Sequence, residues 1–254
     1  MEHEFVNLSL ENIDNIHLCC FIKSKQQHLG VLKKKEWLKE RIKEGHVYRR
    51  LIDDDKMAFI EYAPLEKAWV PIEGDDYLYI YCLSSIGDTR GNSIKKELLE
   101  YAINDAKKAN KAGICVLSHN KKKTWLNDGE FFLKHGFKVV DNTPDGYQLL
   151  TLSLKQNKPH FSLKAKKGMI SDKNLVIYYS YQCPFIFRSI EIIKEYCEKY
   201  SIPLSLKKID TLAKAKRVPS IFNNYAVFYK GNFVTINLLD IVYLERNIHQ
   251  ENKK

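Results

Sequence analysis

The chain has no hydrophobic run long enough to cross a bilayer, and no early apolar stretch of the kind that opens a secretory signal. Its six cysteines show no paired metal-ligand spacing and lie mostly within apolar segments. Such cysteines are typical of reduced, buried thiols rather than of a disulfide framework. No internal repeat is present either. These absences predict a soluble, cytoplasmic protein of 254 residues without a metal site.

Charge is distributed unevenly along the chain, whose formal net charge is +10. Residues 1–159 carry 25 basic and 23 acidic side chains, whereas residues 160–254 carry 16 and 8. Lysine-rich segments in the second part, at 164–167 and 207–217, can attract a polyanion. No recognisable nucleic-acid-binding motif accompanies this charge, so a solvated basic surface is favoured and nucleic acid is not expected as a partner.

The first part of the chain alternates between strand and helix patterns. Strands are expected at 5–10, 46–52, 56–62, 77–83, 113–118, 138–141 and 147–154, with helical regions at 11–45, from Ser93 onward and at 128–135. An antiparallel meander that leads into alternating strands and helices predicts an α+β fold. Its sheet is expected to be mixed, mainly antiparallel and flanked by helices.

A second series follows a polar segment, 156–168, which contains Pro159 and lacks a periodic pattern. The series consists of strands at 174–180, 204–209, 225–229 and 233–236, with helices at 184–200 and 211–216. The sequence therefore predicts two domains, residues 1–155 and a smaller α/β domain at 169–254, joined by a linker at 156–168.

The segment from Tyr77 to Ser93 is the most informative about function. A strand of alternating aromatic and aliphatic residues runs into a polar loop that contains glycine, and a helix then begins. Backbone N–H groups of such a loop and the positive end of the helix dipole point at one place, where they can hold a pyrophosphate. An ordinary strand-to-helix connection is the alternative interpretation.

Together these features make residues 1–155 resemble a GNAT-family N-acetyltransferase. The family motif Q/R-x-x-G-x-G/A aligns with Asp88-Thr89-Arg90-Gly91-Asn92-Ser93, in which Gly91 matches and Ser93 replaces the final Gly or Ala. Asp88 stands where the family usually has a basic or amide residue. Farther along, the sequence FFLKHGF at 131–137, followed by 138–140, resembles the last helix and strand of the family.

The resemblance implies an acyltransferase that uses acetyl-CoA and acetylates a primary amine of a small molecule or peptide by direct attack. It places the pantetheine amides at the strand end, Cys82 and Leu83, with a backbone N–H near Leu83 as the oxyanion donor. It assigns the pyrophosphate to Gly87, Asp88, Thr89, Arg90, Gly91, Asn92 and Ser93. Among these residues, Arg90 can add a charge-assisted contact.

The acid and base of the reaction are left open by the sequence. Family members often have a tyrosine four residues before the Gly of the Gly-Phe pair, and here Phe132, which cannot donate a proton, takes that position. His119, Tyr81 and water are the candidate acids, and Glu61 is a candidate base acting through an ordered water. The alternatives are a solvated strand position for Glu61, a loop histidine for His119 and sheet packing for Tyr81.

Residues 174–236 resemble the thioredoxin-like domain of YoaP-type proteins. The resemblance rests on YYSYQCPFI, residues 178–186, at a strand-to-helix turn and on Arg217-Val218-Pro219-Ser220, whose proline is usually cis in thioredoxins. Cys183 at the helix start, where amide donors and the dipole favour thiolate, is a candidate reactive thiol. Ile186 stands where a C-x-x-C pair has its second cysteine, which leaves monothiol exchange, thiol binding or a structural role. The alternative function for the whole chain is a thiol-recognising or CoA-sensing binding module without acetyl transfer.

Overall fold

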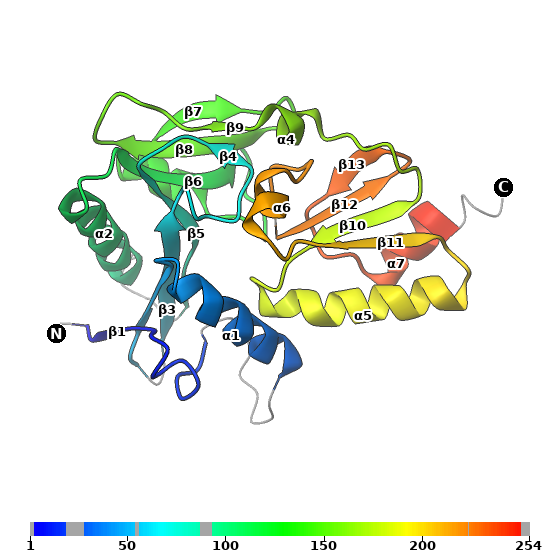
Figure 1. Cartoon of the computed structure of the whole chain (residues 1–254), viewed down its shortest axis with the longest axis horizontal. Helices are drawn as coiled ribbons and strands as arrows, with labels where there is room; N and C mark the ends of the chain where they lie inside the picture. Colours follow the sequence, from blue (N-terminus) through cyan, green and yellow to red (C-terminus); the bar gives the residue numbers. More distant parts are fainter. Residues whose placement is uncertain (1–2, 19–27, 54–55, 87–92, 223, 250–254) are drawn as a thin grey trace. The chain divides into compact units, whose positions relative to one another are not determined.

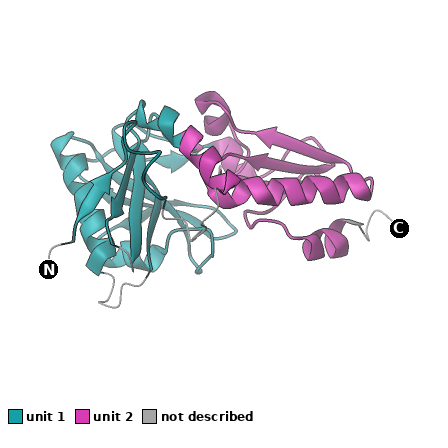
Figure 2. Ribbon diagram, turned by 90° about the horizontal axis from the view of Figure 1, so that it is seen from below, with its two compact units in different colours: residues 1–22, 38–68, 72–162 teal, residues 23–37, 69–71, 163–254 magenta. Residues whose placement is uncertain are grey.

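The chain forms two compact units, drawn in two colours in Figure 2. Unit 1 comprises residues 1–22, 38–68 and 72–162, and unit 2 comprises residues 23–37, 69–71 and 163–254. The computed structural model describes residues 3–18, 28–53, 56–86, 93–222 and 224–249 of the chain. Within these ranges no helix has the length and apolar character that a bilayer crossing requires.

Unit 1 is built on a seven-stranded sheet in the order β1-β2-β3-β5-β6-β8-β7 (Figure 1). Its strands are β1 (Phe5–Asn7), β2 (Val47–Leu51), β3 (Met57–Pro64), β5 (Tyr77–Ile86), β6 (Gly113–His119), β7 (Lys138–Asn142) and β8 (Tyr147–Ser153). Strands β5 and β6 are parallel, and the other neighbours are antiparallel. The prediction of a mixed, mainly antiparallel sheet flanked by helices is confirmed.

Two helices cover one face of this sheet. Helix α2 (Ser93–Lys108) buries Ile94, Leu98 and Ala102 in a core shared with strand residues of β3, β5 and β6, and α3 (Gly129–Lys134) adds two buried phenylalanines. The Tyr62 hydroxyl of β3 donates a hydrogen bond to Asp105, which fixes α2 on the sheet. Burial and this carboxylate both raise the pKa of Tyr62. These two helices thus cover one face of the sheet, and alternate strand residues point to the other face.

Segments outside the expected helices and strands, among them the expected linker 156–168, also contain short helices and strands. Strand β4 (Ile72–Glu73) pairs with β9 (His160–Phe161), and α4 (Leu163–Lys167) follows directly. Both β9 and α4 lie inside the expected linker 156–168, and the division between the compact units falls after Ser162. Of the helical region expected before Gly45, the described residues form α1 (Leu29–Ile42), whose first part belongs to unit 2.

Unit 2 has a four-stranded sheet in the order β11-β10-β12-β13. Its strands are β10 (Leu175–Tyr179), β11 (Leu204–Lys208), β12 (Tyr225–Tyr229) and β13 (Asn232–Thr235). The first two are parallel and joined by α5 (Pro184–Lys199), α6 (Leu212–Lys216) leads to β12, and β12 and β13 form an antiparallel hairpin. Helix α7 (Ile241–Leu244) continues into a π-helical segment, Glu245–His249.

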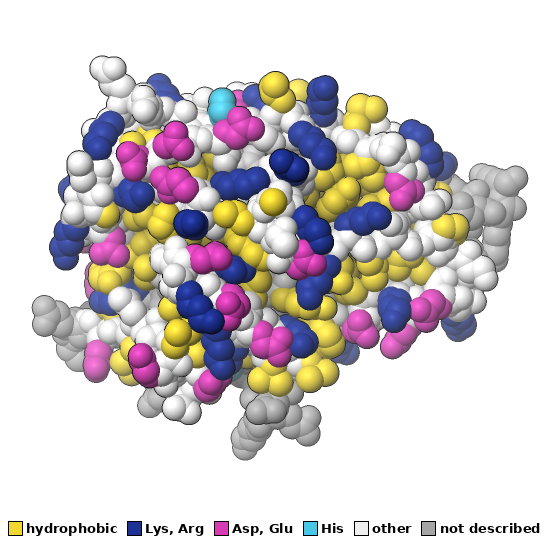
Figure 3. Space-filling view, in the orientation of Figure 1, with side chains coloured by type: hydrophobic (Ala, Val, Ile, Leu, Met, Phe, Trp, Pro, Cys, Tyr) yellow, Lys and Arg dark blue, Asp and Glu magenta, His cyan; other side chains and the backbone are white. Residues whose placement is uncertain are grey.

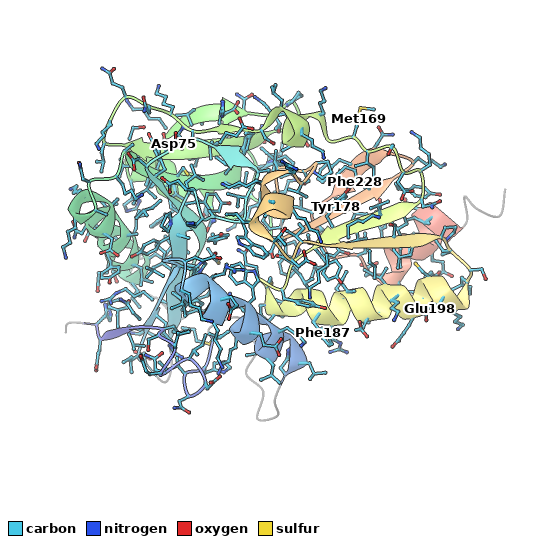
Figure 4. The ribbon with its side chains drawn as sticks, in the orientation of Figure 1. Asp75, Met169, Tyr178, Phe187, Glu198 and Phe228 are labelled. Carbon is cyan, nitrogen blue, oxygen red and sulfur yellow. The ribbon has the colours of Figure 1, made fainter. Side chains whose placement is uncertain are left out.

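The core of unit 2 lies on both faces of its sheet. Helix α5 buries Ile190 and Ile193 against the first face together with residues of α7. On the second face the rings of Tyr178 and Phe228, labelled in Figure 4, meet edge to face with centroids 5.6 Å apart. Because both faces are covered, β10 and β12 carry apolar or aromatic side chains at every position, and alternate residues point to each face.

Unit 2 also recruits residues from far earlier in the chain. Trp69 is buried in a cluster with Ile209, Ala215 and Val218, and the ring of Trp37 meets the Trp69 ring at 6.0 Å. Hydrophobic periodicity shows which face of an element is apolar but not which distant segment covers it, so the division at 155 and 169 did not anticipate these members.

Candidate active site

Strands β5 and β6 pair only along their first halves. Their register runs from Tyr77 opposite Gly113 to Ile80 opposite Val116 and then stops, although both strands continue. Where the pairing ends, β5 has one extra residue relative to β3, because Tyr62 faces Ile80 while Glu61 faces Cys82. A bulge of this kind bends the strand and increases its twist. The bulge at Tyr81 therefore accounts for the separation of β5 from β6.

The bulge also decides which side chains share a face. Ile80 and Leu83 join the core beneath α2, whereas Glu61 and its cross-strand partner Cys82 point to the opposite face. On that face the rings of Tyr79 and Tyr81 meet edge to face at 5.0 Å. Burial raises the pKa of Tyr79, with neighbouring thiol and phenol groups adding to the effect. Three residues expected to be functional, Glu61, Tyr81 and Cys82, are thus brought together at the strand separation.

Glu61 is fully buried, and its neighbour is a histidine that the sequence did not single out. The His46 Nε2 lies 3.6 Å from Glu61 Oε2, within ion-pair distance when the imidazole is protonated, and each side chain is 1% exposed. The His46 ring also packs against Tyr81 at a centroid distance of 5.0 Å. A buried carboxylate requires a compensating partner, so the alternative of a solvated strand position for Glu61 is wrong.

The open edge of β5 is bridged by the side chain of Asn127, from the segment between β6 and α3. The Leu83 N–H donates to Asn127 Oδ1 at 2.9 Å, and Asn127 Nδ2 donates to the Tyr81 carbonyl at 3.2 Å. The N–H expected to serve as oxyanion donor is therefore engaged by a side chain in this structure. No sequence signal marks Asn127, because its contact spans 44 positions.

The N-terminus of α2 follows the expected pyrophosphate loop. Gly87, Asp88, Thr89, Arg90, Gly91 and Asn92 lie outside the described residues. The first turn of α2 contains no acidic residue, and Lys95 and Lys96 lie in it. The Ser93 hydroxyl is buried and makes no hydrogen bond with the described part of the chain. This helix end thus presents positive potential and an unused hydroxyl, which suit an anion.

His119 lies at the end of β6 and binds loop backbone through both ring nitrogens. Its Nδ1 accepts the Lys121 N–H at 2.8 Å, and its Nε2 donates to the Asp145 carbonyl at 3.0 Å. The ring meets Tyr147 edge to face at 4.9 Å, and burial raises the pKa of that tyrosine to about 12. These contacts match the alternative of a loop histidine.

Phe132, at the position where family members often have a tyrosine, is 1% exposed in the core beneath α2.

Cys183 immediately precedes α5 in unit 2. It occupies the N-cap position, is half-buried and makes no capping hydrogen bond through its side chain, and Pro184 begins the helix. Cys197 on the same helix is 2% exposed, and burial raises its pKa to about 11. The Val218–Pro219 peptide bond is trans.

The described residues contain no cluster of metal ligands that would form a further site. Figure 3 shows basic and acidic side chains interspersed over one face of the molecule. Within the described ranges no group of three or more His, Cys, Asp or Glu side chains is arranged to hold a metal ion.

Comparison with known proteins identifies the family. A model described as YoaP-like matches residues 203–246. The chain is 34% identical over 244 residues to the uncharacterised N-acetyltransferase YoaP of Bacillus subtilis (strain 168), and this match covers 95% of the chain and 97% of that protein. The chain belongs to the YoaP family of N-acetyltransferases. The prediction of an acyltransferase is thereby confirmed.

Other matches cover only a part of this YoaP family member. An uncharacterised N-acetyltransferase of Staphylococcus epidermidis is 30% identical over 96 residues, which are 37% of the chain and 58% of that protein. The PaiA N-acetyltransferase of Thermoplasma acidophilum in complex with coenzyme A is 18% identical, with 60% of this chain and 99% of that chain covered and a TM-score of 0.43. A GNAT family acetyltransferase of Brucella melitensis in complex with acetyl-CoA is 14% identical, with 63% and 94% covered and a TM-score of 0.41.

Proposed function

We propose that unit 1 transfers the acetyl group of acetyl-CoA to a primary amine of a small molecule or peptide by direct attack. Family membership supports the reaction class. The observation that carries the proposal for this chain is the separation of β5 from β6 at the Tyr81 bulge, close in sequence to the N-terminus of α2. A strand edge that is not paired to a neighbouring strand suits an extended amide-containing arm, and a helix N-terminus suits phosphate.

The residues that would hold acetyl-CoA fit that ligand in character. The end of β5 at Cys82 and Leu83 offers backbone donors and acceptors. The buried Ser93 hydroxyl, which has no hydrogen-bond partner among the described residues, offers an anion contact at the start of α2. The loop Gly87 to Asn92, with Arg90 as an added cation, joins the two. When bound, acetyl-CoA supplies the activated acetyl thioester.

Glu61 is our candidate for proton acceptance from the amine. Its carboxylate lies on the face that also holds Tyr81, and the adjacent His46 compensates its charge when the imidazole is protonated. Because Glu61 is buried, it acts through an ordered water rather than by touching the amine. Tyr81 and water are the candidate proton donors for the departing thiolate. His119 stays a weaker candidate, since its ring nitrogens already bind Lys121 and Asp145.

Substituting Gly91 by glutamate tests the acetyl-CoA site. We expect the affinity for acetyl-CoA to fall about tenfold or more, because a side chain blocks the backbone approach and its charge repels the pyrophosphate. Isothermal titration calorimetry measures the change. Asn142→Glu places the same new charge at the exposed end of β7 and should leave affinity unchanged. Equal affinities of Gly91→Glu and the unmodified protein would contradict the placement of the pyrophosphate.

We further propose that unit 2 has a thioredoxin-like fold with Cys183 as an accessible thiol. The strand order β11-β10-β12-β13, the parallel β10–β11 pair joined by α5 and the final antiparallel hairpin support this assignment. The absence of a second cysteine at position 186, which is Ile186, argues against dithiol chemistry. A binding role for the thiol, or a structural one, therefore fits better than disulfide exchange.

Alkylation rates should separate the two cysteines of α5. Cys183 is half-buried at the helix start, whereas Cys197 is buried with a pKa near 11, so roughly one in a thousand of its thiols is ionised at pH 8. Iodoacetamide followed by mass spectrometry should therefore find Cys183 modified first. Equal alkylation rates of Cys183 and Cys197 in the folded protein would refute the proposed exposure of Cys183.

Burial of the neutral Cys197 thiol contributes stability that is present below about pH 9 and is lost as pH rises toward 11.

A further inference from the structure

The side chain of Asn127 hydrogen-bonds the edge of β5 that is no longer paired to β6. Its carboxamide accepts from the Leu83 N–H at 2.9 Å and donates to the Tyr81 carbonyl at 3.2 Å. These two backbone groups follow directly after the last β5–β6 pair, Ile80 opposite Val116. Strand β3 occupies the other side of β5. Asn127 therefore takes over the hydrogen bonding that β6 would otherwise provide.

The position of Asn127 is fixed from the β6 side. The Ser118 hydroxyl of β6 donates to the Asn127 carbonyl at 2.9 Å. Two residues later, a Cβ on Gly129 would lie 2.5 Å from that same hydroxyl oxygen, so the segment can pack this closely only because Gly129 has no side chain. The backbone of Asn127 is thus hydrogen-bonded to β6, and its side chain is hydrogen-bonded to β5.

In the free protein the Asn127 carboxamide supplies an acceptor for the buried Leu83 N–H. Leu83 is 6% exposed, and buried backbone N–H groups in native proteins are almost always paired. Without the Asn127 carboxamide, the bulge at Tyr81 would leave the next N–H on this edge without a protein acceptor. A carboxamide suits the task because it presents one acceptor and one donor side by side, as a peptide group does.

The same two groups are required by the proposed function, on which this inference rests. The pantetheine arm is itself a chain of amides, and the Leu83 N–H has a single hydrogen to donate. If that hydrogen were shared between Asn127 and a cofactor carbonyl, both hydrogen bonds would be weakened. We propose that Asn127 holds the β5 edge in the free protein and gives up Leu83 N–H when acetyl-CoA binds, so that one amide is exchanged for another. Asn127 is thus a positioning residue whose release sets part of the cost of cofactor binding.

Removing the carboxamide should make the cofactor bind more tightly. In Asn127→Ala the cofactor no longer displaces an internal hydrogen bond, and the loss of one such bond corresponds to an affinity about tenfold higher. Asn127→Asp keeps an acceptor for Leu83 N–H and strengthens it by charge, although it loses the donor to the Tyr81 carbonyl. Its affinity for acetyl-CoA should be lower than that of the unmodified protein. Asn142→Ala, at an exposed asparagine ending β7, should leave affinity unchanged.

Calorimetry with acetyl-CoA and amide hydrogen exchange of the free proteins form the test. In the free state, the Leu83 amide should exchange faster in Asn127→Ala than in the unmodified protein or Asn142→Ala, while amides of β8 keep their protection and so report an intact sheet. Equal or weaker binding by Asn127→Ala, or an unchanged Leu83 exchange rate, overturns the inference while the acetyl-CoA site stands. If the unmodified protein itself fails to bind acetyl-CoA, the proposed function and the exchange at Leu83 fall together.

Discussion

Replacing His46 with leucine should lower the free energy of unfolding of unit 1 by about 3 kcal/mol. The substitution leaves the Glu61 carboxylate in the interior without the imidazole that lies 3.6 Å away. Desolvation of an uncompensated charge is far more costly than the loss of a surface ion pair. Urea denaturation followed by circular dichroism measures the effect.

An exposed pair of the same composition provides the control. His160 Nε2 lies 4.0 Å from Glu73, and their side chains are 60% and 63% exposed, so His160→Leu should cost less than about 0.5 kcal/mol. The double variant His46→Leu, Glu61→Leu should recover much of the stability lost in His46→Leu, because an apolar pair needs no compensation. Equal losses at His46 and His160 would mean that Glu61 is neutral or is held by other groups.

The second large effect is expected at Gly113, where β6 begins opposite Tyr77. A Cβ on Gly113 would lie 2.4 Å from the Leu152 carbonyl oxygen and 2.7 Å from the Tyr77 ring, and its φ is +155°. Because backbone cannot move aside as a side chain tip can, Gly113→Ala should cost about 3 kcal/mol and disturb the β5–β6 pairing that positions the candidate site.

Gly136 separates the clash from the backbone conformation. Its φ is +86°, but a Cβ there would meet only Leu152 Cδ1 at 3.6 Å, an ordinary contact. Gly136→Ala should therefore cost only about 1 kcal/mol, the price of a left-handed conformation. Denaturation curves of the two variants give the comparison, and a Gly113→Ala protein as stable as Gly136→Ala would show that Leu152 and Tyr77 can yield.

The order of elements around the candidate site could be predicted from the sequence because it depends on local patterns. The alternation from Tyr77 and the helical spacing after Ser93 each arise within one element, and the structure has β5 and α2 there. The assignment of Tyr81 to the strand before the loop needed nothing more than this alternation. What the alternation does not contain is the bulge, since an extra residue shows only against the neighbouring strand.

Pairs between elements were harder to predict, and His46 illustrates the reason. The sequence Asp53-Asp54-Asp55 between the strands expected at 46–52 and 56–62 predicts a tight turn. Such a turn would pair Ile52 with Lys56 and so Tyr48 with Ile60, whereas the structure pairs Tyr48 with Glu61. A shift of one residue moves every side chain to the other face of a strand. With the correct register, His46 is a diagonal neighbour of Glu61, which is the signal that could have revealed the pair.

Trp37 and Trp69 make the order of synthesis matter for this chain. Both are made early, yet Trp69 finds Ile209 and Ala215 only after more than half of the chain has followed it from the ribosome. During that interval the two tryptophan side chains lack the residues that cover them in the folded protein. Exposed aromatic side chains favour binding by chaperones or association with other nascent chains. If translation pauses between residues 153 and 209, all strands of the seven-stranded sheet have been synthesised, but the residues that bury Trp69 have not.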